Sequence, residues 1–242
     1  MNRQTISTNQ IAAYLDSHVR KDKERKYADE HRVRFGLALT VIENLLATNK
    51  QVDSFEYLDI GPHYMTGLVQ NFFPRLRVST IGFAHGSFYD ETKVVDHFKL
   101  DLNTLGDGDP ALTKKKFHLI YMGELLEHLH CPPRAIFSFL SNLVLPGGHL
   151  IIQTPNAVSL TNRLKMVFGR NPYAIRTGPF DHVREYTALE LRCLGLEAKL
   201  TPLKMIHANY FKSRRYDRFA FCASLKSGIT AIYQRSPEGI EE

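Results

Sequence analysis

Apolar residues change their spacing near the fiftieth position of the chain. Before it they recur at helical intervals, first at Ile11 and Leu15 and then from Phe35 to Leu46, which predicts a long amphipathic helix. Residues 18–34, between these stretches, form a dense charge run that we interpret as a solvated helix face. The first fifty residues are therefore expected to form a helical cap.

From residue 51 onward, short apolar strands alternate with helical segments. Strands are predicted at residues 55–60, 77–83, 97–102, 117–122, 149–153, 205–208 and 228–234. Apolar strands separated by helices indicate a parallel sheet that helices cover on both faces. The pattern does not decide whether the last strand, residues 228–234, runs parallel or antiparallel to the others. The pattern predicts an α/β fold with a doubly wound, mostly parallel, seven-stranded Rossmann-like sheet. Residues 51–242 would form one compact unit with the cap of residues 1–50.

Composition excludes several protein classes. Of the 242 residues, 43% are hydrophobic and 23% charged, as in an ordinary globular protein. No apolar run reaches the roughly 18–20 residues of a membrane helix, so we expect no membrane span. The three cysteines, Cys131, Cys193 and Cys222, form no C-x-x-C pair, which disfavours a disulfide framework or thiolate zinc site and favours a reducing, cytoplasmic location. The net charge of +6 is mild.

Candidate chemistry lies where strands end, because ligands of such sheets bind beyond the carboxyl ends of the strands. The first strand runs into Asp59, Gly61 and His63, and an acid followed by a glycine turn suits a nucleoside ligand. The third ends in Asp101 and Leu102, where a carboxylate could accept a hydrogen bond from an adenine or a ribose. Ordinary turns use the same residues, so both interpretations stay open here.

The order of these segments carries a family resemblance. Besides Leu58-Asp59-Ile60-Gly61 and Asp101-Leu102, the chain contains Gly123-Glu124-Leu125-Leu126-Glu127-His128-Leu129, Leu145-Pro146-Gly147-Gly148, Thr154-Pro155-Asn156 and Asp181-His182-Val183-Arg184-Glu185-Tyr186-Thr187. This order resembles class I S-adenosylmethionine-dependent methyltransferases, and most closely their ubiquinone-biosynthesis O-methyltransferase branch. The resemblance implies S-adenosylmethionine as cofactor, bound by Asp59, Gly61, His63, Phe83, Asp101, Leu102, Met122 and Glu124.

Two positions depart from that family's pattern. The first loop usually holds closely spaced glycines, whereas here Gly61 is followed by Pro62 and His63, and the next glycine is Gly67. The second strand usually ends in an acid that grips the ribose, whereas here it ends at Phe83. These departures leave open a diverged protein on the same fold that does not transfer methyl groups.

An acid and histidine cluster is the third chemical candidate. Glu124, Glu127 and His128 are spaced to share one face of a helix, and His182 could return to the same mouth. Ubiquinone-type O-methyltransferases are similar here, and small-RNA 2′-O-methyltransferases use two glutamates and two histidines to hold a divalent ion. By that resemblance, Glu124, Glu127, His128 and His182 would bind a metal ion. Metal-free catalysis by His128, His182 and Glu127, or a structural role, remain the alternatives.

Basic residues mixed with aromatics follow in residues 157–179 and 202–235, and they could grip a phosphate-bearing acceptor. The sequence therefore predicts a methyltransferase that methylates an oxygen of a small molecule, a sugar or a glycan. An enzyme resembling RNA 2′-O-methyltransferases is the alternative. Nucleic acid is disfavoured as a partner, because no separate RNA-binding module is present. The sequence does not indicate whether the protein is a monomer or an oligomer.

Overall fold

A computed structural model describes residues 6–18, 22–48, 54–83, 89–105, 110–172, 182–211 and 215–237. Its seven-stranded sheet has the order β3-β2-β1-β4-β5-β7-β6. The strands are β1 (Phe55–Ile60), β2 (Leu76–Gly82), β3 (Val94–Lys99), β4 (Phe117–Gly123), β5 (Val144–Pro155), β6 (Leu200–Ala208) and β7 (Gly228–Arg235).

Strands β1 to β5 pair in parallel, and β7 runs antiparallel to both β5 and β6. The predicted doubly wound, mostly parallel sheet is confirmed, and the direction of the last strand, which the sequence left open, is antiparallel. The chain reverses its winding direction between the neighbours β1 and β4. Their carboxyl ends therefore flank the switch point at which such sheets bind ligands.

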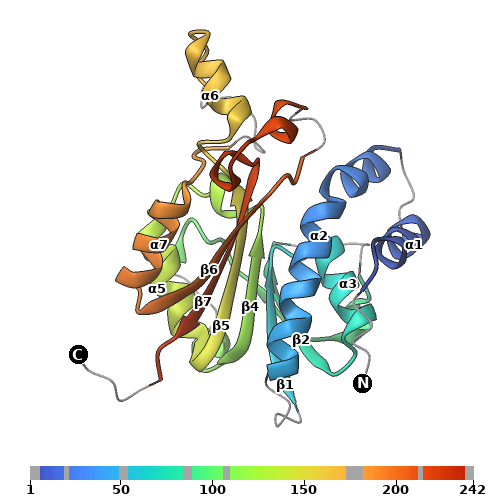
Figure 1. The fold of residues 1–242 in the computed structure, drawn as a ribbon. Coiled ribbons are helices and arrows are strands. Elements are labelled where there is room, and N and C mark those ends of the chain that lie inside the picture. The colour runs from blue at the N-terminus through green and yellow to red at the C-terminus, as the bar shows by residue number, and fades with distance from the viewer. Residues whose placement is uncertain are drawn as a thin grey trace.

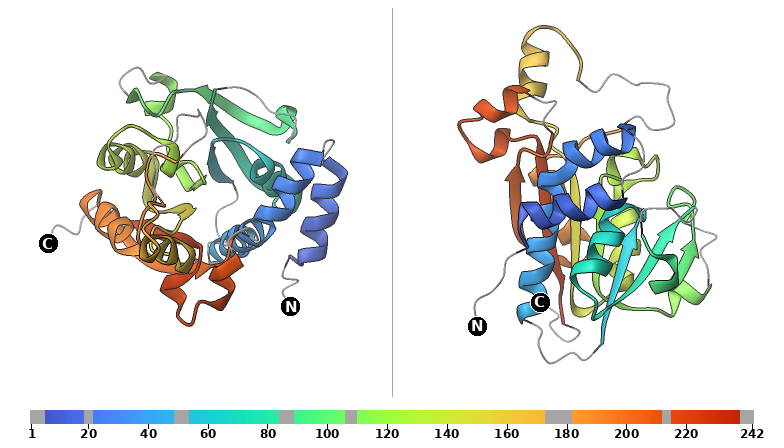
Figure 2. Two further views of the ribbon diagram at one scale, coloured as in Figure 1. Left: turned by 90° about the horizontal axis from the view of Figure 1, so that it is seen from above. Right: turned by 90° about the vertical axis from the view of Figure 1, so that its right-hand side faces the viewer.

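Helices cover both faces of the sheet (Figures 1 and 2). One face carries α1, α2 and α3, and the other carries α5 and α7, while α6 projects beyond the carboxyl ends of the strands (Figure 1). The α-helices are α1 (Thr8–His18), α2 (Asp22–Thr48), α3 (Tyr64–Phe72), α4 (Pro110–Thr113), α5 (Pro133–Leu143), α6 (Leu160–Val167) and α7 (Ala188–Glu197). The short 3-10 helices are η1 (Glu91–Lys93), η3 (Leu126–His128), η4 (Arg215–Phe219) and η5 (Ala223–Leu225).

Each face of the sheet has its own apolar core. Because side chains alternate along a strand, Leu58 and Ile60 of β1 pack toward the α5 face, and Tyr57 packs toward the cap. The cap joins the second core through Phe35 and Leu39 of α2. The predicted N-terminal helices are thus present, and they share a core with the sheet.

Three strands differ clearly from their predicted bounds, namely β3, β5 and β6, of which β6 begins at Leu200 and not at residue 205. β3 begins at Val94 and ends at Lys99, so Asp101 lies beyond the strand. β5 begins at Val144, and its pairing with β4 shifts register between Phe117 and Leu119. The Pro146-Gly147-Gly148 segment of the family motif is an irregular part of β5, in which Gly147 takes a left-handed φ of 77°.

No helix in the described part of the chain is both long enough and apolar enough to span a membrane. All three cysteines are free.

Candidate active site

The turn after β1 is built around Gly61 and Asp59. Gly61 has a φ of 76°, a left-handed conformation that favours glycine, and its N–H donates to the Ile81 carbonyl at 2.9 Å. The Thr66 hydroxyl of α3 donates to the Asp59 carboxylate at 2.7 Å. Burial raises the pKa of Asp59 to about 7, although the Thr66 hydrogen bond and the Arg34 charge act in the opposite direction. An acid is thus held at the switch point.

A cavity of about 320 Å³ opens beyond the ends of β1, β2 and β3. Four of the residues predicted to bind the cofactor line it: Gly61, Phe83, Asp101 and Leu102. The Asp101 carboxylate accepts the Asn103 N–H at 2.9 Å, which fixes the turn after β3. Phe83 is 66% exposed and forms part of the rim, at the position where the family usually has an acid.

A second cavity, of about 170 Å³, adjoins the first, because Gly61 and Leu125 line both. Its walls include three more of the predicted residues: Asp59, His63 and Glu124. Helix α2 of the cap contributes Tyr27, Arg34 and Phe35 to the walls of this second cavity.

The charge run of residues 18–34 is not simply a solvated helix face. His31 and Arg34 are only 9% and 3% exposed, and Arg34 donates a hydrogen bond to the Tyr121 hydroxyl at 3.1 Å. Both lie on the helix face that carries the buried residues Ala28 and Phe35, at spacings of three or four residues. That shared face was the signal in the sequence, and it was hidden because the neighbouring positions are charged.

Met122 does not contact either cavity. Its side chain is fully buried in the apolar core on the α5 face, because strand alternation turns it away from the cap. Its neighbours Tyr121 and Gly123 line the smaller cavity instead. The predicted cofactor contact of Met122 stays a prediction, while the residues on either side of it line the cavity.

The segment after β4 is not the α-helix on which the predicted cluster of four residues depended. Glu124 has a φ of 53°, so the chain turns sharply before the short 3-10 helix Leu126–His128 begins. Glu124 lines the smaller cavity, whereas Glu127, His128 and His182 form a separate group. The shared helical face predicted for Glu124, Glu127 and His128 is wrong.

Glu127, His128 and His182 converge beyond the end of β4. Their potential ligand atoms lie within 4.8 Å of one another, and the two imidazole rings are 4.8 Å apart between centroids. The Glu127 carbonyl accepts the N–H groups of Val183 and Arg184 at 2.8 and 3.2 Å, which brings the segment of His182 to this point. Asp181, its neighbour in the predicted motif, lies outside the described residues.

The Glu127 carboxyl is fully buried. One oxygen accepts the Thr154 hydroxyl at 3.1 Å, and the other, Oε1, has no hydrogen-bond partner among the residues that the structure describes. Burial, and then the charge of Glu124, raises the pKa of Glu127 well above its ordinary value. The group therefore holds a buried carboxyl with a raised pKa beside two imidazoles.

A second carboxyl group, that of Glu185, contacts His182. Glu185 lies 3.2 Å from Nδ1 of His182, and its other oxygen accepts the Asn162 amide of α6 at 2.8 Å. Because this contact occupies Nδ1, Nε2 is the ring nitrogen left for other partners. Glu185 belongs to the Asp181–Thr187 motif, but the sequence alone predicts no role for it.

The group has donor types that suit a divalent ion, but its atoms are not placed to coordinate one. A carboxylate oxygen and two imidazole nitrogens suit an ion such as zinc. Two ligands about 2.2 Å from one ion can be at most about 4.4 Å apart, which is less than the spread of this group. With Glu124 outside it, the group does not match the predicted set of four ligands.

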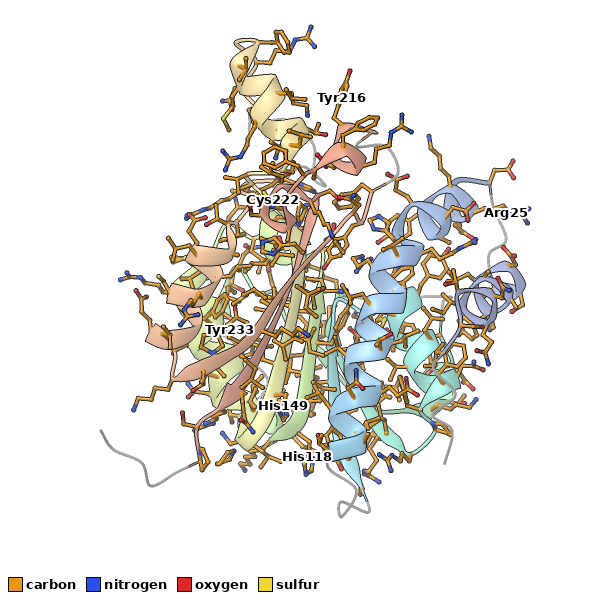
Figure 3. All side chains as sticks on the ribbon, viewed as in Figure 1. Arg25, His118, His149, Tyr216, Cys222 and Tyr233 are labelled. Atoms are coloured by element: carbon orange, nitrogen blue, oxygen red, sulfur yellow. The ribbon has the colours of Figure 1, made fainter. Side chains whose placement is uncertain are left out.

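The basic segments separate into structural and exposed parts. Arg235 donates to the Ser141 and Val144 carbonyls at 2.9 and 2.8 Å, so it is structural. Around α6 and η4, exposed basic and aromatic residues gather at the end of the molecule where Tyr216 and Cys222 lie (Figure 3). They include Arg163, Lys165, Phe168, Arg170, Arg218, Phe219 and Phe221. Residues 173–181 and 212–214 lie outside the described chain.

Comparisons with known proteins agree with this geometry. A family model described as "Methyltransferase domain" matches residues 31–204. No curated protein gives a significant sequence match. Many solved structures share the fold, and three of them have 12–16% identity with this chain.

The first is N-methyltransferase NodS from Bradyrhizobium japonicum WM9 in complex with S-adenosyl-L-homocysteine. It has a TM-score of 0.52 and 14% identity, over 92% of this chain and 97% of that one. The second is magnesium protoporphyrin IX methyltransferase (ChlM) from Synechocystis PCC 6803 with S-adenosyl-L-homocysteine bound. It has a TM-score of 0.56 and 12% identity, over 93% of this chain and 92% of that one. The third is an S-adenosylmethionine-dependent methyltransferase from Clostridium acetobutylicum ATCC 824. It has a TM-score of 0.56 and 16% identity, over 81% of this chain and 89% of that one. The chain therefore belongs to the methyltransferase domain family and is a class I S-adenosylmethionine-dependent methyltransferase.

Proposed function

We propose that this methyltransferase methylates a hydroxyl oxygen of a small molecule, a sugar or a glycan, with His128 or His182 as general base. The observation that carries the proposal is the convergence of the two imidazoles beside the buried Glu127 carboxyl. A hydroxyl is weakly acidic, so its attack on a methyl group is aided by a group that takes its proton. Imidazole has an ordinary pKa suited to that task near neutral pH.

The cofactor would occupy both cavities. The larger one would hold the adenosine, with Asp101 near its polar edges, and the smaller one would hold the methionine portion, with Asp59 near its ammonium group. The sulfonium would then lie near the shared walls, Gly61 and Leu125. The described part of the chain thus offers two adjoining cavities for adenosine and amino acid, despite the departures at Pro62 and Phe83.

In the transfer step, the acceptor oxygen attacks the methyl carbon in line with the carbon–sulfur bond. The new carbon–oxygen bond forms as the carbon–sulfur bond breaks, and its electron pair leaves on sulfur as the neutral thioether S-adenosylhomocysteine. The hydroxyl proton goes to an imidazole nitrogen. Alignment of the three atoms supplies much of the acceleration.

The resemblance to ubiquinone-biosynthesis O-methyltransferases supports a hydroxyl acceptor. An RNA 2′-hydroxyl is the second candidate, favoured by the exposed basic and aromatic residues of α6 and η4. Retention of RNA by the protein that falls steeply with salt would favour this candidate over a small molecule.

The test follows a radiolabelled methyl group from S-adenosylmethionine into catechol, glucose, a primary amine and a carboxylic acid. The proposal predicts a methyl ether, identified by mass spectrometry, and activity that survives a chelator. A labelled amine or methyl ester without any ether would contradict it. Activity that is lost on chelation and restored by a divalent ion would favour the metal-bound hydroxyl that the family resemblance implies. Undetectable cofactor binding would favour a diverged protein.

A further inference from the structure

Large apolar side chains are exposed together at the outer end of α6. Met166, Val167 and Phe168 follow one another there and are 47%, 78% and 76% exposed. Phe221, shortly after η4, is 88% exposed. Single exposed apolar residues are ordinary on a protein surface, whereas a group of them at one place marks an interaction surface.

The same residues lie on a projecting part of the molecule. Helix α6 extends beyond the carboxyl ends of the strands, and η4 packs beside it (Figures 1 and 2). Asp217 of η4 joins the two, because its carboxylate accepts the Thr161 N–H of α6 at 2.7 Å. Its carbonyl accepts the Asn209 amide at 3.0 Å, which fixes η4 to the end of β6. We call the exposed residues of 163–170 and 216–221 the tip patch.

The charges of the tip patch have one sign. Arg163, Lys165, Arg170 and Arg218 are all exposed, and among the described residues none of these four cations forms an ion pair. Asp217 is the only acid in residues 163–170 and 216–221, and it is buried. The surface that complements this patch electrostatically is therefore anionic.

Exposed apolar side chains surrounded by cations are typical of proteins that bind at a membrane surface. The apolar side chains enter the boundary between headgroups and acyl chains, while lysine and arginine attract anionic lipid headgroups. RNA would also attract the cations, but it is gripped by stacking on aromatic rings, to which the aliphatic Met166 and Val167 add nothing. We infer that the tip patch docks this protein on the surface of an anionic lipid bilayer.

Docking at the tip would also orient the candidate active site. The Asn162 amide, at the inner end of α6, donates to Glu185 at 2.8 Å, and Glu185 contacts His182 at 3.2 Å. The side of the site that receives the acceptor is thus attached to the element that meets the lipid, which suits an acceptor that resides in the membrane. This consequence rests on the proposed function, whereas docking itself requires no methyl transfer.

The test measures co-sedimentation of the full chain with vesicles of phosphatidylcholine, with and without phosphatidylglycerol. The wild type should bind the anionic vesicles at least about tenfold more tightly, and less so as salt is added. Two paired variants remove the two parts of the patch: Phe168→Ser with Phe221→Ser, and Lys165→Gln with Arg170→Gln. Each pair should weaken binding to anionic vesicles by about tenfold or more.

Matched control pairs change exposed residues outside the tip patch by the same chemistry. They are Leu189→Ser with Leu196→Ser, and Lys114→Gln with Arg192→Gln. Both should bind vesicles as the wild type does, and every variant should keep its affinity for S-adenosylhomocysteine, which shows that the fold is intact.

Three results would overturn the inference. The first is equal binding of the wild type to both kinds of vesicle, or none to either. The second is an equal loss in the tip and control pairs, or a loss that depends on the cations and not on the phenylalanines, because simple charge attraction needs no apolar tip. The third is retention of single-stranded RNA that the tip variants abolish, without vesicle binding, which would make RNA the partner of the patch. Loss of methyl transfer with intact vesicle binding would count against the proposed function alone.

Discussion

The imidazole rings of His128 and His182 meet almost at right angles, with an interplanar angle of 81° and centroids 4.8 Å apart. His128 belongs to the 3-10 helix after β4, and His182 belongs to the segment before α7, so the fold itself brings them together. The buried carbonyl of Glu127 is the anchor, because it accepts two N–H groups of the His182 segment. A residue that was predicted for its carboxyl thus also acts through its main chain.

Glu185 is expected to position His182, because it contacts Nδ1 of that ring and the Asn162 amide at once. Glu185→Gln should lower kcat by about tenfold or more. The reason is that glutamine has one acceptor oxygen where glutamate has two, so it cannot accept from both the His182 ring and the Asn162 amide in the same way. The affinity for S-adenosylmethionine should stay unchanged in the same variant. Glu197→Gln, which alters an exposed acid of α7, is the control. A parallel loss of cofactor affinity and stability would show that Glu185 only supports the fold.

Asp59 is expected to make stability depend on pH. Its pKa is about 7 in the folded protein against an ordinary value of 3.8, so the folded state binds more protons between these values. The free energy of unfolding should therefore fall as pH rises from about 4 to 7, by up to about 4 kcal/mol, and then level off. Asp59→Asn should remove this decline, which urea unfolding at pH 5 and pH 8 can measure. The raised pKa of Glu127 acts in the same direction, and only the difference between variant and wild type isolates Asp59. Equal pH dependence in both proteins would contradict the prediction.

The absence of a side chain at Gly82 is expected to leave the space that Pro62 of the first loop occupies. A Cβ added at Gly82 would lie 2.8 Å from the Cδ atom of Pro62, and both residues line the larger cavity. Gly82→Ala should therefore displace Pro62 and weaken binding of S-adenosylhomocysteine, at a stability cost of about 1–3 kcal/mol. Gly36→Ala is the control, because its new Cβ meets Ile11 at an ordinary 3.4 Å within a helix. Wild-type affinity in folded Gly82→Ala would remove this contact from the account of the site.

Much of the fold could be predicted because the strand pattern is strong. Apolar runs that alternate with helices imply a parallel sheet, and a parallel sheet brings Asp59, Asp101 and Glu127 to one edge. Boundaries were less predictable, as in β5, whose glycines take strand positions through a register shift. Local spacing alone does not encode such irregular pairing.

The missed parts of the site depend on tertiary context. The spacing of Glu124, Glu127 and His128 is helical, but the left-handed φ of Glu124 turns its side chain into another cavity. Arg34 appeared to belong to a solvated charge run, because its burial depends on the tyrosine of a distant strand. The spacing of apolar residues predicts which face of a helix or strand a residue occupies. It does not predict which polar group of another element contacts that residue.

The central claim is that an imidazole at the end of β4 takes the proton of a hydroxyl acceptor. Methyl ether formation on catechol at saturating S-adenosylmethionine tests it most directly, in the wild type and in His128→Asn and His182→Asn. The exposed neighbour variant His130→Ala is the control. We predict that at least one of the two variants loses about 10²- to 10⁴-fold in kcat, with unchanged cofactor affinity and with His130→Ala fully active. Wild-type kcat in both His128→Asn and His182→Asn would contradict the account.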